Sequence, residues 1–359
     1  MLPSLWRRPE LGRGLRVMAG AGFRPGLVSA VTPTYNRAEF LREAIESALA
    51  QTYTNLEIIV VDDGSTDHTR EVCARYKDRV KYIQRENDGT RGNGARARAI
   101  LESRGEWVAL LDHDDRWLPT KIEQQVAAAG QGGRTGIVFT AARIIDATGR
   151  PTGEGFAPGP SGDVFHQFLA GLRYCASSAL VRRSAIDFVR AKSPEGDFLP
   201  AMKYWNNDTD LWIRIARYYE VICLGEVLTE YRYHEGNDSA DRPRLWATDM
   251  TMLAAKTAFL HADCRDCEQS LRAGLRDLKG RLAVAHFDGF IERTLRGEKA
   301  LGSFAAALRA DFSSFLAPRR CGAAVKYLTA SMTRFVRSMT NGSANGKNSS
   351  NSQTTGKRL

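Results

Sequence analysis

The chain has 359 residues, 43% of them hydrophobic and 26% charged, which is the composition of a globular protein with a substantial core. No apolar stretch approaches the ~20 residues that span a bilayer, and the arginine-rich first 24 residues lack the apolar centre of a cleaved signal peptide. The net charge of +10 lies at the ends, with +4 in residues 1–24, +8 in residues 312–359 and −2 between them. This distribution argues against a basic nucleic-acid-binding body, so we expect no nucleic acid partner.

Between residues 27 and 139 the spacing of apolar residues predicts strands that alternate with helices. The expected strands are 27–31, 56–61, 80–83, 107–111 and 136–140, and the expected helices are 38–51, 67–76, 94–103 and 121–129. Strands separated by helices imply parallel crossovers. We therefore expect an α/β fold with a mainly parallel sheet and helices on both faces.

The rest of the chain has a different pattern. Residues 149–162 are rich in glycine and proline, which predicts a loop or lid. Residues 243–339 are mostly helical in pattern, and the Asn-, Ser- and Gly-rich tail is expected to be disordered. The predicted organisation is a basic N-terminal extension (1–26), an α/β domain (27–240), a helical C-terminal extension (241–340) and a disordered tail (341–359).

The first motif is "TPTYNR" at residues 32–37, where the first expected strand ends. Pro33 is expected to stop the strand ladder. The residues that follow then either face a ligand at the carboxyl edge of the sheet or form an ordinary turn in which Asn36 caps the next helix. The sequence alone does not decide between these two interpretations.

The second motif is "VDDGSTD" at residues 61–67, at the end of the second expected strand. Asp62 or Asp63 can accept hydrogen bonds from a nucleobase or a ribose hydroxyl, as acids do in other nucleotide-binding sheets. The alternative is turn chemistry, with Gly64 in a tight turn and Asp67 capping the next helix.

The third motif is Asp112-His113-Asp114-Asp115, directly after the apolar strand 107–111. Clustered carboxylates repel one another, so folding alone rarely requires them. A hard divalent cation bound to a phosphate explains them better than a solvated acidic turn does.

In this order and at these spacings, "VTPTYNR", "VDDGSTD" and "LLDHDDRWLP" resemble family 2 glycosyltransferases of the GT-A fold. The resemblance runs from about residue 27 to about residue 233. It implies a Rossmann-like GT-A domain, a nucleotide-diphosphate-sugar donor, a divalent metal (Mg²⁺ or Mn²⁺) and inversion at the anomeric carbon. It also implies a hexosyltransferase type of activity in cell-envelope or surface glycan synthesis.

The resemblance also assigns roles to residues. Asp114 would be the metal ligand, and Asp112 would bind the metal or the ribose, as the two acids of a D-x-D signature. Arg96, in "GARARAI", would approach the nucleobase or the diphosphate, or else be a solvated helix charge. The residues implied to hold the nucleoside are Pro33, Thr34, Tyr35, Asn36, Arg37, Asp62 and Asp63.

The catalytic base implied by the resemblance is Asp208, in "NDTDLWIR". Asn207 stands where the family usually has Glu, so this match is partial. A helix cap at Asn207, with Asp208 and Asp210 favoured in the first turn, is the alternative, and it does not exclude a base. His234 either touches the diphosphate or is structural.

We expect a UDP-sugar as donor and a glycan or lipid-linked acceptor. The alternative functions are a nucleotidyltransferase and a non-catalytic nucleotide-sugar-binding module. Near the C-terminus one helical stripe accompanied by basic residues would either lie on an anionic bilayer or pack against the core. The apolar members of this stripe are Val325, Leu328, Met332 and Phe335.

Six cysteines are too few for a disulfide scaffold in a chain of this length and suit a reducing compartment, so we expect a cytoplasmic protein, with membrane contact at the inner face if the stripe binds lipid. Cys264 and Cys267 form a Cys-x-x-Cys pair that follows His261, which suggests zinc or redox chemistry. No companion pair closes such a site, and a helical segment with incidental thiols is the alternative.

Overall fold

The computed structural model describes residues 23–87, 89–90, 92–130, 134–193, 207–256 and 264–295, together with residues 306 and 309. The strands are β1 (Arg24–Thr34), β2 (Leu56–Asp62), β3 (Val80–Gln84), β4 (Gly105–Leu110), β5 (Arg116–Trp117), β6 (Thr135–Ile145), β7 (Pro151–Phe156), β8 (Leu180–Arg182) and β9 (Glu220–Arg232). The α-helices are α1 (Ala38–Leu49), α2 (Thr69–Ala74), α3 (Asn93–Glu102), α4 (Lys121–Ala129), α5 (Phe165–Leu169), α6 (Arg183–Ala191), α7 (Asn207–Ala216), α8 (Arg242–Ala254) and α9 (Arg265–Leu295).

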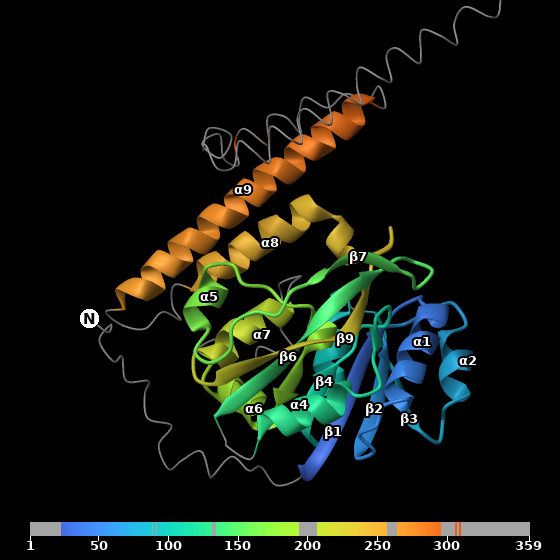
Figure 1. Ribbon diagram of the computed structural model, residues 1–359. Coiled ribbons are helices and arrows are strands. Elements are labelled where there is room, and N and C mark those ends of the chain that lie inside the picture. The colour runs from blue at the N-terminus through green and yellow to red at the C-terminus, as the bar shows by residue number, and fades with distance from the viewer. Residues whose placement is uncertain are drawn as a thin grey trace, which may run out of the picture. The chain divides into compact units, whose positions relative to one another are not determined.

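The described strands form one sheet in the order β3-β2-β1-β4-β8-β6-β9-β5, with β7 paired to β6 (Figure 1). The half from β3 to β4 is parallel throughout, as the sequence predicts. In the other half β8, β5 and β7 run antiparallel to their neighbours, while β6 and β9 are parallel. The expected α/β fold with a mainly parallel sheet is confirmed.

Successive strand residues point to opposite sides of the sheet. Because the residues on both sides are apolar, helices cover both faces. Val28, Ala30, Ile58 and Val60 share one hydrophobic cluster with apolar residues of α1 and α4. The α3 and α6 helices contact β1, β2 and β4 instead, and they contribute no residue to that cluster. The buried positions of α1 recur at the three- and four-residue spacing that predicted this helix.

Two local expectations were wrong. β1 does not stop at Pro33, because its pairing with β2 continues through Pro33 and Thr34. On the β4 side the pairing has already ended at Val31, so the missing N–H of proline leaves no gap in the ladder. Residues 149–162 are not all loop, because 151–156 form the exposed edge strand β7 against β6.

The register places the ends of the parallel strands in one row. Thr34 of β1 lies opposite Asp62 of β2, and Asp62 lies opposite Gln84 of β3. The β4 strand ends next to Val31, three residues before the end of β1. The turns that follow all four strands therefore meet at the carboxyl edge of the sheet, where open α/β sheets bind ligands.

The chain divides into two compact units, Met1–Leu275 and Arg276–Leu359. The sheet, α1 to α8 and the first part of α9 belong to the first unit. Two buried ion pairs attach the α8 region to this unit: Arg173 with Asp249, and Lys256 with Asp210 of α7. The domain boundary expected at residue 240 stays a prediction.

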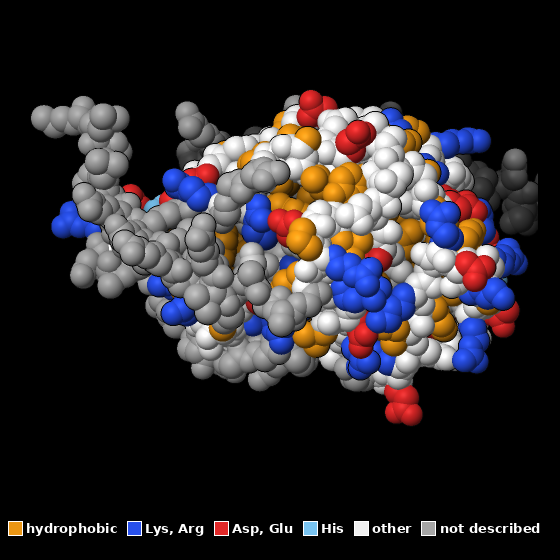
Figure 2. All heavy atoms as spheres, turned by 90° about the horizontal axis from the view of Figure 1, so that it is seen from below, with side chains coloured by type: hydrophobic (Ala, Val, Ile, Leu, Met, Phe, Trp, Pro, Cys, Tyr) orange, Lys and Arg blue, Asp and Glu red, His pale blue; other side chains and the backbone are white. Residues whose placement is uncertain are grey.

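Most of the N-terminal extension, the basic C-terminal stripe and the tail 341–359 lie outside the described residues. Within the described part, no helix is both long and apolar enough to cross a membrane. The face in Figure 2 shows Lys and Arg side chains interspersed with Asp and Glu. This mixture agrees with the small net charge of residues 25–311.

Candidate active site

The turn after β1 is tied to the turn after β2 by Asn36. This residue has a left-handed backbone (φ 50°), which asparagine tolerates better than most residues. Its Oδ1 accepts hydrogen bonds from the backbone N–H of Thr66 (2.7 Å) and of Asp67 (3.3 Å), and its own N–H donates to Ser65 Oγ. Asn36 does not cap α1. Asp67 does so instead, because its Oδ2 accepts from the N–H of Ala38 at 3.1 Å.

The other side chains of the first motif differ in exposure. Thr34 is buried, and within the described part of the chain its hydroxyl has no hydrogen-bond partner. Tyr35 is 44% exposed. The Arg37 guanidinium donates to the carbonyl oxygens of Asn36 and Gly236, which joins this turn to the segment after β9.

The two acids of the second motif are both buried, but they have different partners. Oδ1 of Asp62 accepts from the N–H and the hydroxyl of Ser65, and its Oδ2 accepts from the Tyr82 hydroxyl at 2.6 Å. These contacts fix the turn. Asp63 is fully buried, and its Oδ1 lies 3.1 Å from Nη1 of Arg85.

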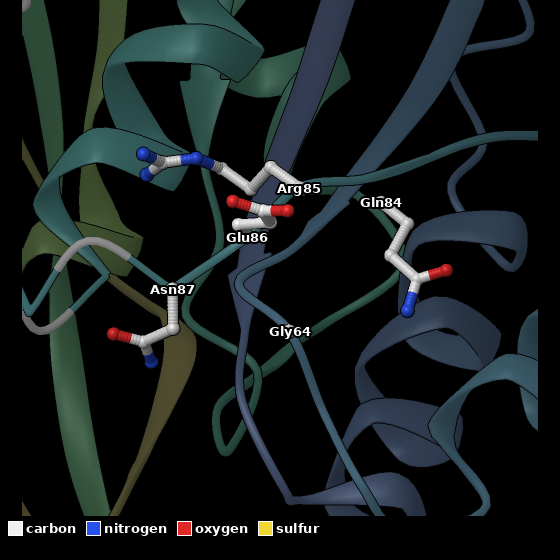
Figure 3. Close-up of a pocket in the computed structure, with 5 residues that line it drawn as sticks. All are labelled: Gly64, Gln84, Arg85, Glu86 and Asn87. Carbon is white, nitrogen blue, oxygen red and sulfur yellow. The ribbon is translucent and has the colours of Figure 1, made fainter.

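An open hollow of about 470 Å³ lies where β2 and β3 end. It is lined by Gly64, Gln84, Arg85, Glu86 and Asn87 (Figure 3). Gly64 has φ +84°, and a Cβ at this position would lie 3.1 Å from the backbone nitrogen of Asn87. The position therefore requires glycine, because a side chain would be strained and would crowd the wall of the hollow.

The third motif begins with Asp112, which follows the buried residue Leu111 just after the end of β4. Its backbone N–H donates to Ser177 Oγ at 2.9 Å. Its Oδ1 accepts from Nη2 of Arg96 on α3 at 2.5 Å. Arg96 is therefore not a solvated helix charge: its side chain is 14% exposed and lies in the acidic cluster.

Asp114 faces the segment after β9. Its Oδ2 lies 3.1 Å from Nε2 of His234 and accepts from the Asn237 amide at 3.4 Å. Burial acts to raise the Asp114 pKa, but the nearby imidazoles of His113 and His234 outweigh it and hold this pKa below its ordinary value. Asp114 therefore remains ionised, which a metal ligand requires. His113 itself points back toward the Pro33 carbonyl, at 3.2 Å.

Asp115 has a different environment from the two acids before it. Its carboxyl group is buried, lies 2.6 Å from the Ser177 hydroxyl and accepts from the Arg232 backbone N–H at 2.8 Å. Burial, reinforced by the charges of Asp114 and Asp112, raises the Asp115 pKa well above its ordinary value. The contacts of Asp115 to Ser177 and to the Arg232 backbone brace the loop.

The raised pKa of Asp115 predicts that Asp115→Asn is tolerated. A carboxyl group with a raised pKa in the folded state makes stability fall as pH rises above about 4, the unfolded value. Asparagine keeps the hydrogen bonds but does not titrate. The free energy of unfolding of the variant should therefore not decrease with pH in this way. Urea unfolding between pH 4 and 8 measures the effect. Asp115→Ala should instead cost roughly 1–3 kcal/mol, because Ser177 and the Arg232 N–H lose their partner. An asparagine variant with the pH dependence of the wild type would contradict this.

Arg232 holds the backbone of the acidic loop, residues 112–115, in place. Its side chain is fully buried, and its Nε donates to the Asp114 carbonyl at 2.8 Å. The same guanidinium donates to the Ala147 carbonyl at 3.2 Å, pairs with Glu43 of α1 and lies over the Phe40 ring, 4.8 Å from the centroid. The position of Asp114 is thus fixed by contacts to three separate segments.

Asp208 lies in the first turn of α7, where its Oδ1 accepts from the Thr209 N–H at 2.7 Å. Burial raises the Asp208 pKa, Arg96 opposes this rise, and Asp112 adds to it. The reciprocal effect is present at Arg96, whose pKa is raised by Asp112, Asp208 and Asp114 against the effect of burial. The structure therefore brings all four residues into one cluster. The Asn207 side chain lies outside the described residues, so its capping role stays a prediction.

Several residues of this site were not predicted as functional. Arg232 and Ser177 position the acids, and Arg85 pairs with Asp63. Arg232 has a weak sequence signal, because it lies within residues 27–233, over which the sequence resembles the family. Ser177 has none, since a serine in "CASSAL" looks like any other.

The family profile of glycosyl transferase family 2 matches residues 29–189. This segment contains β1 to β8 and all three motifs at the carboxyl edge of the sheet. Residues 29–189 form a glycosyltransferase family 2 domain. The recognition made from the motifs is therefore confirmed.

Two relatives illustrate the range of similarity. An uncharacterized glycosyltransferase of Rickettsia typhi is 33% identical over 219 residues, which cover 58% of this chain and 64% of the relative. The UDP-Glc:alpha-D-GlcNAc-diphosphoundecaprenol beta-1,3-glucosyltransferase WfaP of Escherichia coli is 40% identical over 100 residues, 28% of this chain and 40% of the relative. The chain thus spans less than two thirds of the length of these relatives.

A solved structure shares the fold of this chain. The mannosyltransferase PcManGT of Pyrobaculum calidifontis, solved with GDP-Man and Mn²⁺, superimposes with a TM-score of 0.54 at 18% identity. The match covers 86% of each chain. The expected GT-A architecture is confirmed.

Proposed function

We propose that this chain is a metal-dependent, inverting glycosyltransferase that moves a sugar from a nucleotide-diphosphate-sugar to an acceptor hydroxyl. The observation that supports it best is the cluster of Arg96, Asp112, Asp114 and Asp208 at the carboxyl edge of the sheet. The hollow lined by Gly64 and Arg85 opens at the same edge, where β2 and β3 end. A donor with its nucleoside in the hollow and its diphosphate at the cluster fits this arrangement.

The nucleoside part would be held by the first two motifs. Arg85 lines the hollow and pairs with the buried Asp63, so this pair would offer donors and an acceptor to a base or a ribose. Tyr35 presents an exposed ring on which a base can stack. Asn36 and Asp62 would act mainly by shaping the turns, because their side-chain oxygens accept hydrogen bonds from those turns. Pro33, Thr34 and Arg37 complete the predicted nucleoside set.

The acids Asp112 and Asp114 fit a divalent cation. Carboxylate oxygens suit Mg²⁺ and Mn²⁺, and the imidazole of His234 beside Asp114 is also compatible with Mn²⁺. A bound cation would neutralise the charge that develops on the leaving nucleoside diphosphate. The protein's own contribution is to hold Asp114 ionised and fixed, through His234 and Arg232.

The acceptor hydroxyl needs a base, because a sugar hydroxyl is a poor nucleophile near neutral pH. Asp208 would take its proton as the oxygen attacks the anomeric carbon. The raised pKa of Asp208 makes it a stronger base than an exposed carboxylate, while the charge of Arg96 limits the rise. A single displacement of this kind inverts the anomeric configuration.

The substrates are proposed by chemistry and similarity together. The name of the Escherichia coli relative includes a UDP-Glc donor and a lipid-diphosphate acceptor. A Bacillus subtilis relative, 38% identical over 105 residues, is named a putative teichuronic acid biosynthesis glycosyltransferase. By analogy with these relatives, we propose a UDP-sugar donor and a glycan or lipid-linked acceptor. The proposed role is cell-envelope glycan synthesis on the cytoplasmic side of the membrane.

The experiment that tests this function is a transfer assay with a panel of nucleotide sugars ranked by Mn²⁺-dependent thermal shift. We expect sugar transfer or slow donor hydrolysis that EDTA abolishes and Mn²⁺ restores. Binding without turnover for any donor would instead mark a non-catalytic module. Attachment of the nucleoside monophosphate to an acceptor would mark a nucleotidyltransferase.

The membrane prediction has its own test, although the stripe lies outside the described residues. If the basic helix binds lipid, the full chain should float with liposomes that contain anionic phospholipid, and a chain ending at residue 311 should not. Flotation should also weaken with salt, because the attraction is electrostatic. Equal flotation of both chains would contradict lipid binding through this segment.

A further inference from the structure

Three metal-binding side chains meet on elements that do not form the catalytic cluster. His166 lies on α5, Cys264 immediately precedes α9, and Cys267 lies in the first turn of α9. Nε2 of His166 is 3.6 Å from Sγ of Cys264 and 3.3 Å from Sγ of Cys267. All three ligand atoms lie within 4.8 Å of one another. All three residues belong to the first compact unit.

The two distances from the His166 nitrogen to the sulfurs are close to those of a tetrahedral zinc centre. With Zn–S bonds of about 2.3 Å and Zn–N bonds of about 2.05 Å, tetrahedral angles place N and S about 3.6 Å apart. An S–H···N hydrogen bond explains one sulfur at such a distance, but two thiols that converge on the same ring nitrogen exceed what one lone pair can accept. Neither cysteine forms a disulfide.

The surroundings also favour a metal over incidental thiols. Cys267 is fully buried, while Cys264 and His166 are half-buried. Two thiolates and an imidazole are a preferred donor set for Zn²⁺ and a poor one for Mg²⁺ or Mn²⁺. The cysteines also lie at the amino end of α9, where the helix dipole favours negative charge.

We propose that His166, Cys264 and Cys267 bind a zinc ion that fastens α9 to α5. Among the described His, Cys, Asp and Glu side chains these three converge, and a water molecule would complete the tetrahedron. His261 lies outside the described residues and forms no part of the proposal.

The zinc would link α9 and α5, two helices that already pack closely against each other. Gly274, seven residues after Cys267 on the same face of α9, approaches α5 so closely that an added Cβ would lie 2.0 Å from the Leu169 carbonyl oxygen. The five-residue helix α5 is too short to be stable alone. It also contacts α7, which carries Asp208. The ion would thus hold α9 against α5, which itself contacts the helix that carries the proposed base.

The test measures zinc in the full chain, purified under reducing conditions without a polyhistidine tag. We expect one zinc per chain by elemental analysis, and thiolate-to-metal charge-transfer bands together with tetrahedral d–d bands after exchange into Co²⁺. Loss of an outer-shell partner already costs about 10–100-fold in metal affinity. We therefore expect Cys267→Ser or His166→Gln to weaken zinc binding at least about a hundredfold.

Matched variants separate this site from general damage and from the catalytic cation. Cys223→Ser and His68→Gln change the same residue types elsewhere and should retain zinc. Asp114→Ala should also retain zinc, because Asp114 is not one of the three proposed ligands. Mg²⁺ or Mn²⁺ at the acidic cluster gives no thiolate charge-transfer band, so the spectrum reports on the thiolate site alone. Zinc retained in both ligand variants, a wild type with neither zinc nor a cobalt spectrum, or a Cys264–Cys267 disulfide in its place would overturn the proposal.

Discussion

Asp114→Ala is expected to abolish sugar transfer and to weaken donor binding in the presence of Mn²⁺. A unit charge pair about 4 Å apart contributes about 4 kcal/mol at an effective dielectric of 20. At about 1.4 kcal/mol for each tenfold change, its loss lowers the rate about a thousandfold or more. Calorimetry with a UDP-sugar, with and without Mn²⁺, should show that only the metal-dependent part of the affinity is lost.

The fold should survive this substitution, because Arg232 contacts the backbone carbonyl of Asp114 and not its carboxylate. Asp187→Ala provides the matched control: it removes a carboxylate of α6 that pairs with Arg183 and Arg190, remote in sequence from the three motifs. This control should bind donor and turn over like the wild type. If Asp114→Ala kept the full Mn²⁺-dependent donor affinity of the wild type, Asp114 would not be a ligand of the metal.

Asp208→Asn is expected to abolish transfer while leaving donor affinity nearly unchanged. General base catalysis contributes about 10²–10⁴-fold, and asparagine cannot accept the proton. Because the Asp208 pKa is raised, the wild-type rate should climb with pH through a value above the ordinary one of about 4. The variant should retain only a low, pH-independent rate.

Steady-state kinetics across pH 4–8 and donor calorimetry together distinguish a base from a binding residue. A base variant loses kcat with unchanged donor Kd, whereas a binding residue changes Kd. Asp187→Asn controls for the loss of one charge. Wild-type turnover in Asp208→Asn would exclude the proposed base, even if the metal site is correct.

The sequence predicted those features that local pattern determines. The strands of the parallel half were placed within a few residues because apolar runs end at turn residues. Parallel strands then bring their carboxyl ends to one edge, so Asp62, Asp63 and Asp112 were expected on the same rim without any knowledge of contacts. Only the continuation of β1 past Pro33 differed there, since the proline faces a position where β4 has already ended.

Features that depend on long-range contacts were not predictable in the same way. Arg232 meets Asp115 across 117 residues of sequence, and Ser177 meets Asp115 across 62. The half of the sheet with mixed strand directions produces these contacts, and no local spacing encodes its strand order. The edge strand β7 was missed for a related reason: its glycines suggest a loop, and only its pairing with β6 makes it a strand.

The convergence at His166 shows the same limit. The Cys-x-x-Cys pair was visible in the sequence, but its partner lies 98 residues before Cys264 on a short helix. The sequence offered His261, the nearest histidine, as the companion. The structure brings in His166 because α5 lies against the first turns of α9.

The most direct measurement is anomalous X-ray scattering from crystals of the full chain soaked with Mn²⁺ and UDP. We predict a manganese peak on the Asp114 carboxylate that also touches the diphosphate, with the nucleoside in the hollow where β2 and β3 end and with Asp208 facing the sugar side of the diphosphate. A manganese peak away from Asp112 and Asp114, or UDP bound with Asp208 on a different surface, would contradict a shared site at this edge of the sheet.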